Sequence, residues 1–174
     1  MNDCSPVLVY AALGSNMGDR WDALRRARSW LSRVAVGGHL QESPIYETLP
    51  VGPGIQDCYL NQVVRFKSSL NPEAMLYFFK EVECWLGRRA RPRFHPREVD
   101  LDLLFYGNVA ISTPELVVPH ARWSERSFVL VPLLDLEPDF RCPLTGNHAH
   151  DLLLENCPTW ESEVWHFQKE PVLA

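Results

Sequence analysis

The order in which helical and strand-like patterns follow one another constrains the fold of this chain most strongly. One helical segment follows Asp19 and is expected to end at Gly37, and a second follows Asn71 and is expected to end at Gly87. Aspartate and asparagine both cap helix N-termini, and glycine commonly follows a helix C-terminus. Apolar residues recur at helical spacing in both segments, so each helix has one face for a core.

Four strand-like runs lie around these two helices and cover residues 7–13, 39–48, 59–69 and 99–106. The first is a short apolar run typical of a buried strand, whereas Pro44 in the second favours an edge or irregular strand. The order of strand, helix, strand, strand, helix and strand predicts an α+β fold, the ferredoxin-like β-α-β-β-α-β sandwich. We expect a single antiparallel sheet with both helices on one face.

Further elements are expected to be appended at the C-terminal side of this sandwich. Residues 127–136 are strongly apolar and predict a short packed helix in spite of Pro132, and residues 151–157 indicate a last helix. Since the sequence contains no repeat or linker, residues 1–174 are predicted to form a single domain. No apolar run approaches the roughly 20 residues that a membrane helix needs, and no signal peptide is recognised.

The cysteines are odd in number and form no C-x-x-C pair; they are Cys4, Cys58, Cys84, Cys142 and Cys157. Free thiols in a reducing cytoplasm are the simplest interpretation, and we predict a cytoplasmic monomer. A zinc site can be composed from Cys142, His148, His150 and Cys157, but their spacing matches no zinc template. We therefore favour solvated histidines ahead of the last helix.

Arginines are concentrated in one loop. Five of the ten residues from Arg88 to Arg97 are arginine, in a chain whose formal net charge is −5. A local excess of positive charge in an acidic protein indicates a specific anion and argues against a general nucleic-acid surface. Arg97 is the first functional candidate because it adjoins the next strand, and Arg88 is the second. A solvated basic loop remains the alternative for each arginine, above all for Arg89.

Two carboxylates follow this loop on the predicted strand. Asp100 and Asp102 are two residues apart, so their side chains leave the same face, while Leu101 and Leu103 point toward the core. An exposed polar sheet face is the alternative for an isolated pair, but the neighbouring arginines favour a cation. Carboxylates that hold Mg²⁺, next to guanidinium groups that hold phosphate oxygens, are what a metal-bound polyphosphate requires.

Several other residues suit the binding of phosphate or of a flat ring. His120 and Arg126 lie downstream of the aspartates and make a phosphate contact plausible. Tyr59 and Asn61 share one strand face and, together with Phe128, could sandwich a heterocycle and hydrogen-bond to its edge, although core packing is the alternative for each ring. The chain has no G-x-x-x-x-G-K-[ST] loop, so phosphoryl chemistry here would need another scaffold.

Taken together, these segments resemble the 6-hydroxymethyl-7,8-dihydropterin pyrophosphokinase family of folate biosynthesis. The resemblance runs from about residue 7 to 140 in the family's order and rests on these segments: Leu13-Gly14-Ser15-Asn16, Ser43-Pro44-Ile45-Tyr46-Glu47-Thr48, Tyr59-Leu60-Asn61, Gly87-Arg88, Pro96 to Asp102, Val118-Pro119-His120, and Arg126 to Leu133. It implies a ferredoxin-like fold and the transfer of pyrophosphate from ATP to the pterin hydroxymethyl group, with release of AMP.

The resemblance also implies roles for individual residues. Catalysis would fall to Arg88, Arg97, Asp100 and Asp102, the two aspartates being ligands of two Mg²⁺ ions. Residues that would meet ATP are Lys80, Glu83, Arg88, Arg97, His120 and Arg126. Residues that would form the pterin pocket are Thr48, Val51, Tyr59, Asn61 and Phe128. Phe94 matches an aromatic residue of the arginine loop, whereas Arg89, Arg91 and Arg93 match no individual family position.

The chain departs from the family pattern at Leu49, His95, Glu98 and Ala121. Because Glu98 and Ala121 are near the expected phosphate site, a catalytically weak relative that binds pterin or nucleotide as a regulator is one alternative. A ferredoxin-like RNA-binding module is another, but the acidic net charge and the lack of an exposed aromatic RNA-binding signature argue against it. The partners expected are therefore two small molecules, ATP and the pterin alcohol, with no nucleic acid and no membrane.

Overall fold

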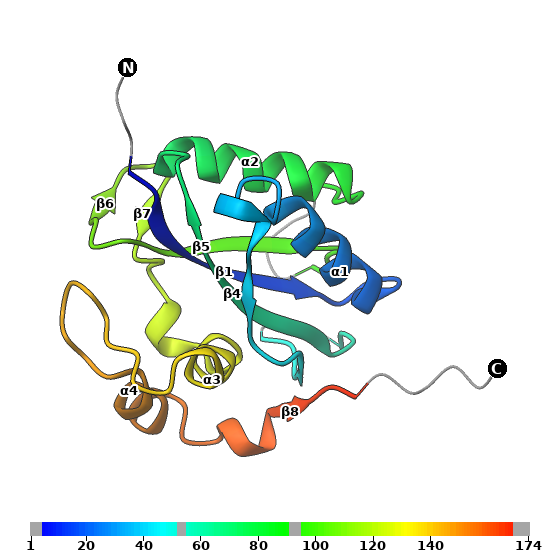
Figure 1. Ribbon diagram of the computed structural model, residues 1–174. Helices are drawn as coiled ribbons and strands as arrows, with labels where there is room; N and C mark the ends of the chain where they lie inside the picture. Colours follow the sequence, from blue (N-terminus) through cyan, green and yellow to red (C-terminus); the bar gives the residue numbers. More distant parts are fainter. Residues whose placement is uncertain (1–4, 52–54, 91–94, 169–174) are drawn as a thin grey trace.

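A computed structural model describes residues 5–51, 55–90 and 95–168 and contains a six-stranded antiparallel sheet at its centre (Figure 1). Its strand order is β5-β1-β4-β3-β8, and β2 also pairs with β4. The strands are β1 (Val7–Ser15), β2 (Gln41–Glu42), β3 (Tyr46–Thr48), β4 (Tyr59–Ser68), β5 (Asp100–Tyr106) and β8 (Val164–His166). The prediction of an antiparallel sheet is therefore confirmed.

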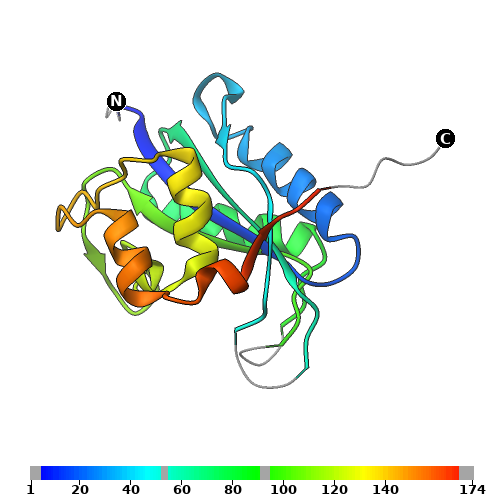
Figure 2. The same ribbon diagram turned by 90° about the horizontal axis from the view of Figure 1, so that it is seen from below.

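Helices cover both faces of this sheet, so the molecule has three layers (Figures 1 and 2). On one face, α1 (Arg20–Leu31) and α2 (Pro72–Trp85) pack on a core that includes Leu13 and Leu101. On the other face, α3 (Ser127–Leu136) and α4 (Ala149–Asn156) close a second core. Burial of two apolar layers against one sheet is the main stabilising contribution to this arrangement.

Both early helices begin where the sequence predicts. The side chain of Asp19 accepts a hydrogen bond from the backbone N–H of Asp22, and that of Asn71 accepts one from Ala74. These caps satisfy donors that the first turn of a helix leaves without partners. However, α1 ends at Leu31 instead of continuing to Gly37, because tighter turns follow at once and lead into the 3₁₀ helix η1 (Val36–Gly38).

The strand β5 positions the two aspartates. Leu101 and Leu103 are buried in the core beneath α1 and α2, so Asp100 and Asp102 face the side of the sheet that carries α3. The register of β1 and β5 shifts by one residue between Tyr10 and Ala11. This β-bulge lies beyond the aspartates and leaves their alternation intact.

The C-terminal part is more elaborate than the sequence indicates. It contains the hairpin β6 (Ile111–Ser112) and β7 (Val117–Val118), and the 3₁₀ helices η2 (Trp123–Glu125) and η3 (Trp160–Ser162). The helix predicted over residues 127–136 is confirmed, and α4 begins at Ala149, slightly before the predicted start. In the part of the chain that the structure describes, no helix is long and apolar enough to cross a membrane.

Candidate active site

A cavity of about 220 Å³ opens where β1, β4 and β5 meet the loop before α3. Its walls contain most of the residues that the sequence singles out, from four separate stretches of the chain. The lining residues are Ala12, Leu13, Gly14, Thr48, Leu49, Val51, Tyr59, Asn61, His95, Arg97, Asp100, Asp102, His120, Arg122, Arg126 and Phe128. The cavity therefore combines aromatic, amide, carboxylate and guanidinium groups.

The two aspartates lie among positive charges. Both oxygens of Asp100 accept hydrogen bonds from Arg97 Nη1 at 2.8 Å, and Arg88 Nη1 lies 2.9 Å from the same carboxylate. Asp102 Oδ2 is 3.3 Å from Arg126 Nη1 and 3.9 Å from His120 Nε2. Arginines and carboxylates thus alternate along the cavity floor, as a site for a metal-bound polyphosphate requires.

Arg97 is held by the turn that follows β1. The Asn16 N–H donates to the Arg97 carbonyl at 3.1 Å, and Asn16 Oδ1 accepts from the Arg97 N–H at 2.7 Å. Ser15 Oγ also donates to the carbonyl of Glu98 at 2.6 Å. Sequence reasoning assigned no role to Ser15 and Asn16, although two polar residues directly after a buried strand are a usable signal. Both are buried, so they fix the main chain from which Arg97 extends.

Burial and neighbouring carboxylates shift the pKa values of Arg97 and His120 in opposite directions. Burial acts to lower the pKa of Arg97, but the Asp100 carboxylate outweighs it, and the pKa is raised. Burial lowers the pKa of His120 and so favours the neutral imidazole, with Asp102 opposing this only in part. His120 Nδ1 accepts a hydrogen bond from the backbone N–H of Arg122, a cavity residue that sequence reasoning missed.

A second cavity of about 330 Å³ adjoins the first through Arg97, which lines both. Its walls are formed by Lys80, Glu83, Cys84, Arg88, Arg89, Ala90 and Arg97. The buried Glu83 accepts from the Leu101 N–H at 2.8 Å, lies 3.2 Å from Lys80 Nζ, and forms a close ion pair with Arg88. Burial raises the pKa of Glu83, and the Leu101 N–H and the two cations oppose that rise.

Two aromatic residues, Tyr59 and Phe128, line the first cavity. Asn61 Nδ2 donates to Thr48 Oγ1 at 2.7 Å, and both residues are buried. The Arg126 guanidinium lies 5.4 Å from the centre of the Phe128 ring. Val51 lines the same cavity. Two aromatic rings and an oriented amide in one cavity suit a flat heterocycle with polar edge groups.

All thirteen residues predicted for the site line one of the two cavities, and several neighbours were missed. Besides Arg122, the structure adds Gly14 to the first cavity, together with Leu49 and His95, two positions at which the chain departs from the family pattern. Arg91, Arg93 and Phe94 lie outside the described residues. Cys58, Cys84, Cys142 and Cys157 are free thiols, and Cys4 lies outside the description.

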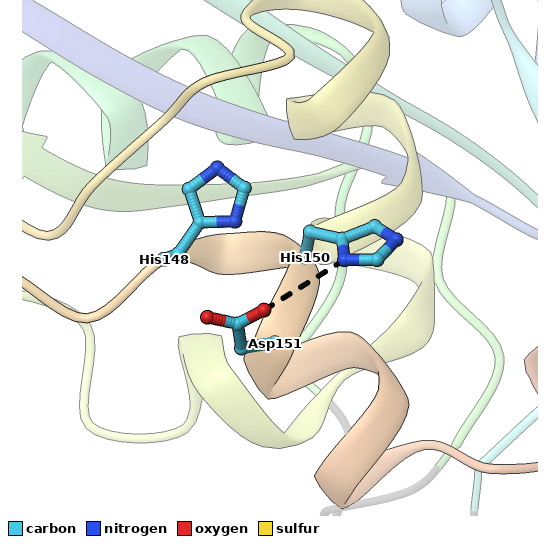
Figure 3. A group of neighbouring side chains, drawn as sticks. All are labelled: His148, His150 and Asp151. Carbon is cyan, nitrogen blue, oxygen red and sulfur yellow. Dashed lines mark ion pairs between the residues drawn. The ribbon is translucent and has the colours of Figure 1, made fainter.

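The zinc arrangement considered from the sequence is not formed among the described residues. A group of metal-ligating side chains does occur there, but its members are His148, His150 and Asp151 at the start of α4 (Figure 3). Cys142 and Cys157 are buried in the second core instead of joining it. The positive end of a helix disfavours a cation at this place, so the cluster is better explained as solvated side chains.

Comparisons with known proteins agree on one family. Residues 10–138 match the sequence model described as 7,8-dihydro-6-hydroxymethylpterin-pyrophosphokinase, HPPK. A Bacillus subtilis 2-amino-4-hydroxy-6-hydroxymethyldihydropteridine pyrophosphokinase is 44% identical over 129 residues, which cover 74% of this chain and 77% of the relative. A Pseudomonas aeruginosa protein of the same name is 37% identical over 150 residues, which cover 86% of this chain and 91% of the relative.

Solved structures show the same fold. A crystal structure of Plasmodium falciparum HPPK-DHPS with pterin and p-hydroxybenzoate matches with a TM-score of 0.70 at 13% sequence identity. The match covers 93% of this chain and 45% of that one, so the chain spans less than half the length of this solved protein. At this identity the likeness concerns the fold alone.

Proposed function

The chain belongs to the 7,8-dihydro-6-hydroxymethylpterin-pyrophosphokinase family, and from this premise we infer how its residues carry out the reaction. The protein transfers pyrophosphate from ATP to the hydroxymethyl group of 6-hydroxymethyl-7,8-dihydropterin in folate biosynthesis, as an ATP-dependent diphosphotransferase that releases AMP. One observation carries the residue assignments that follow: two aromatic residues, a buried amide and an arginine–aspartate cluster line one cavity.

We propose that the pterin lies between Tyr59 and Phe128, with Thr48, Val51 and Asn61 at its edges. The buried Asn61–Thr48 hydrogen bond supports this placement, because it fixes the amide that would pair with the polar edge of the ring. A hydrogen-bonding site of this kind rejects analogues that lack the matching donor or acceptor.

We place ATP across the two cavities, which meet at Arg97. Arg88, Arg97, His120 and Arg126 would contact its phosphates, and Lys80 and Glu83 would face the rest of the nucleotide from α2. The positions of the four phosphate-binding candidates around Asp100 and Asp102 support this assignment. Guanidinium groups suit the oxygens of a polyphosphate because each can donate two parallel hydrogen bonds.

Asp100 and Asp102 are the residues that would hold two Mg²⁺ ions. The donor set fits, because two carboxylates leave the same face of β5 into a cavity that also has room for phosphate. Bound magnesium would supply charge neutralisation on the phosphate oxygens.

The reaction requires in-line displacement at the β-phosphorus. A bond forms from the hydroxymethyl oxygen to that phosphorus, the bond to the α–β bridging oxygen breaks, and AMP leaves with the bonding electrons while the hydroxyl proton is released. Arg88 and Arg97 would stabilise the negative charge on the transferred group, and the pterin pocket would orient the attacking oxygen. Positioning and charge stabilisation are the main contributions that a protein makes to phosphoryl transfer.

We also propose that the sheet and the pair α1 and α2 form a ferredoxin-like sandwich within a single domain. The strand order β5-β1-β4-β3 supports this, because it alternates early and late strands as that topology does. A monomeric state and a cytoplasmic location remain predictions.

The decisive assay incubates the protein with ATP, Mg²⁺ and the pterin alcohol and separates AMP from ADP. AMP formation is expected, whereas formation of ADP alone or no turnover would contradict the proposal; tight pterin binding without turnover would favour the regulatory alternative. Asp100→Ala is expected to lower the rate by at least about a thousandfold. The matched control is Asp151→Ala, an exposed aspartate outside both cavities, which should leave the rate unchanged.

The fold of Asp100→Ala should survive. Arg88 keeps its ion pair with Glu83, but Arg97 loses its carboxylate partner, so the unfolding free energy is expected to fall by about 1–3 kcal/mol, which a folded protein can tolerate. An active Asp100→Ala variant would refute the assignment of this residue.

A further inference from the structure

The C-terminal segment returns to β3, whose last residue lines the cavity, from outside the region that the family model matches. The family match ends at residue 138, whereas η3 and β8 are formed by residues 160–166. Figure 2 shows this segment, coloured red, running beside the strand that carries Tyr46–Thr48. Sequence reasoning predicted no strand here and assigned the segment no role.

Backbone pairing joins β8 to the strand that ends in the pterin pocket. Thr48 is opposite Val164, and Tyr46 is opposite His166. The pairing continues past both ends of β3, because the Leu49 N–H donates to the Glu163 carbonyl at 3.0 Å and the Phe167 N–H donates to the Ile45 carbonyl at 2.8 Å. As a result, β3 has a neighbouring strand on each side, β4 and β8.

Side chains strengthen this pairing. Val164 is buried in the second core, and the His166 ring lies on the Tyr46 ring with their centres 4.5 Å apart. His166 Nε2 is also 3.3 Å from the Tyr46 hydroxyl, which donates a short hydrogen bond to Asp135 of α3. The strand is therefore fastened to β3 and, through Tyr46, to α3.

Glu163 contacts two segments that contribute residues to the first cavity. Its carbonyl accepts from the Leu49 N–H, directly after Thr48. Its carboxylate accepts from Ser127 Oγ at 3.4 Å, directly before Phe128, and from Thr159 Oγ1 at 2.5 Å. A single residue thus links the wall that carries Thr48 to the wall that carries Phe128.

We propose that Glu163 and β8 form a positioning element for the pterin pocket, here called the C-terminal clasp (residues 163–167). The clasp fixes the distance between Thr48 and Phe128 and so prepares the pocket for a flat ring before the substrate arrives. A strand of three residues has little stability of its own, and a second hydrogen-bonded neighbour restricts its freedom. Restriction before binding lowers the entropy lost when the ligand binds.

This inference rests on the proposed function, and it predicts an effect on one substrate only. The clasp contacts Leu49 and Ser127 beside the pterin pocket, whereas the candidate ATP residues Lys80, Glu83, Arg88 and Arg97 lie on α2 and in the loop before β5. Only Arg126 adjoins a residue that the clasp contacts, and its guanidinium pairs with Asp102 of β5. Loss of the clasp should therefore raise the KM for the pterin and leave the KM for ATP unchanged. A segment that merely stabilised the whole fold would change the KM for both substrates or for neither.

The test uses the chain of residues 1–174 and removes one backbone N–H. Phe167→Pro eliminates the backbone N–H that donates to the Ile45 carbonyl. Phe167→Ala also removes the phenylalanine side chain but keeps this N–H. Gln168→Pro places proline one residue farther along, past the last bond to β3. We expect Phe167→Pro to raise the KM for the pterin about tenfold relative to Phe167→Ala, with the KM for ATP and the melting temperature close to those of Phe167→Ala. Gln168→Pro should match the unmodified chain.

A second pair of variants covers the case in which Phe167→Pro does not fold. Glu163→Ala removes the carboxylate that accepts from Ser127, and Glu161→Ala removes an exposed carboxylate of η3 as its control. The expected result is a rise of about threefold in the KM for the pterin with Glu163→Ala alone. Equal rises in both KM values, or an unchanged pterin constant in both clasp variants, would overturn the proposal.

Direct titration of the pterin alcohol, followed by its own fluorescence, separates this inference from the proposed function. If the unmodified chain binds the pterin but forms no AMP, the proposed function fails while the clasp can still be tested by the dissociation constant. If the clasp variants bind the pterin as the unmodified chain does, the clasp is refuted whatever the turnover.

Discussion

Gly14 is the place where the smallest change should damage the proposed pterin pocket most selectively. It lies in β1 between two strands, opposite Asn61 of β4 and opposite Asp100 of β5. A Cβ atom at this position would lie 2.9 Å from Asn61 Oδ1 and 3.9 Å from Tyr59 Cδ1. The backbone of Gly14 has no positive φ, so alanine introduces this contact without backbone strain.

The size of the effect follows from what holds Asn61 in place. A carbon and an oxygen approach to about 3.4 Å at their closest comfortable distance, so the amide must move by about half an ångström. Asn61 is buried and its Nδ2 donates to Thr48 Oγ1 at 2.7 Å, so movement weakens that bond. Loss of one buried hydrogen bond costs about 1.5 kcal/mol, which corresponds to about a tenfold weaker pterin interaction.

The measurement is the KM of Gly14→Ala for the pterin and for ATP, determined by the AMP assay. We expect the KM for the pterin to rise about tenfold and the KM for ATP to stay within about twofold. The cause is tested in an Asn61→Ala background, where the added methyl group no longer meets an amide and should have little further effect. An equally large effect of Gly14→Ala in both backgrounds would refute the steric explanation.

Two further predictions concern buried ionisable groups. Glu83→Gln keeps an acceptor for the Leu101 N–H but leaves Arg88 and Lys80 without their buried carboxylate, so urea unfolding should show a loss of about 3 kcal/mol; unchanged stability would contradict this account. Burial, with help from Glu137, raises the pKa of Tyr10 to about 12, so stability should fall between about pH 10 and pH 12 as the unfolded chain loses this proton first. Tyr10→Phe should lose less stability over that interval, and an equal loss in both proteins would exclude Tyr10 as the cause.

Local signals allowed much of the fold to be predicted from the sequence. Asp19 and Asn71 mark helix starts because a capping side chain acts on backbone groups only three residues away. The alternation of Leu101 and Leu103 with two aspartates correctly placed the carboxylates on one face of β5, because strand geometry alone sets that period. The site residues came from such patterns and from a family resemblance.

Elements that depend on distant partners could not be predicted in this way. The three residues of β8 carry no alternating pattern long enough to indicate a strand, and they become one only by pairing with β3, more than a hundred residues earlier. Asn16 likewise appears as a turn residue in the sequence, because its hydrogen bonds to Arg97 join segments that are far apart along the chain. Long-range pairing, and not local propensity, defines both features.

The ion pairs of the cavity should couple the binding of a cation to the binding of a polyphosphate. Both oxygens of Asp100 accept hydrogen bonds from Arg97, so a cation that binds this carboxylate competes with the guanidinium for it. A released, partly buried guanidinium needs another anion, because an unpaired charge in that position is costly. The phosphate oxygens of ATP bound as proposed would supply that anion, and Arg88 would stay paired with Glu83 during the exchange. The arrangement therefore favours arrival of the cation and the polyphosphate together, since either one alone would leave a charged side chain of the site without its partner.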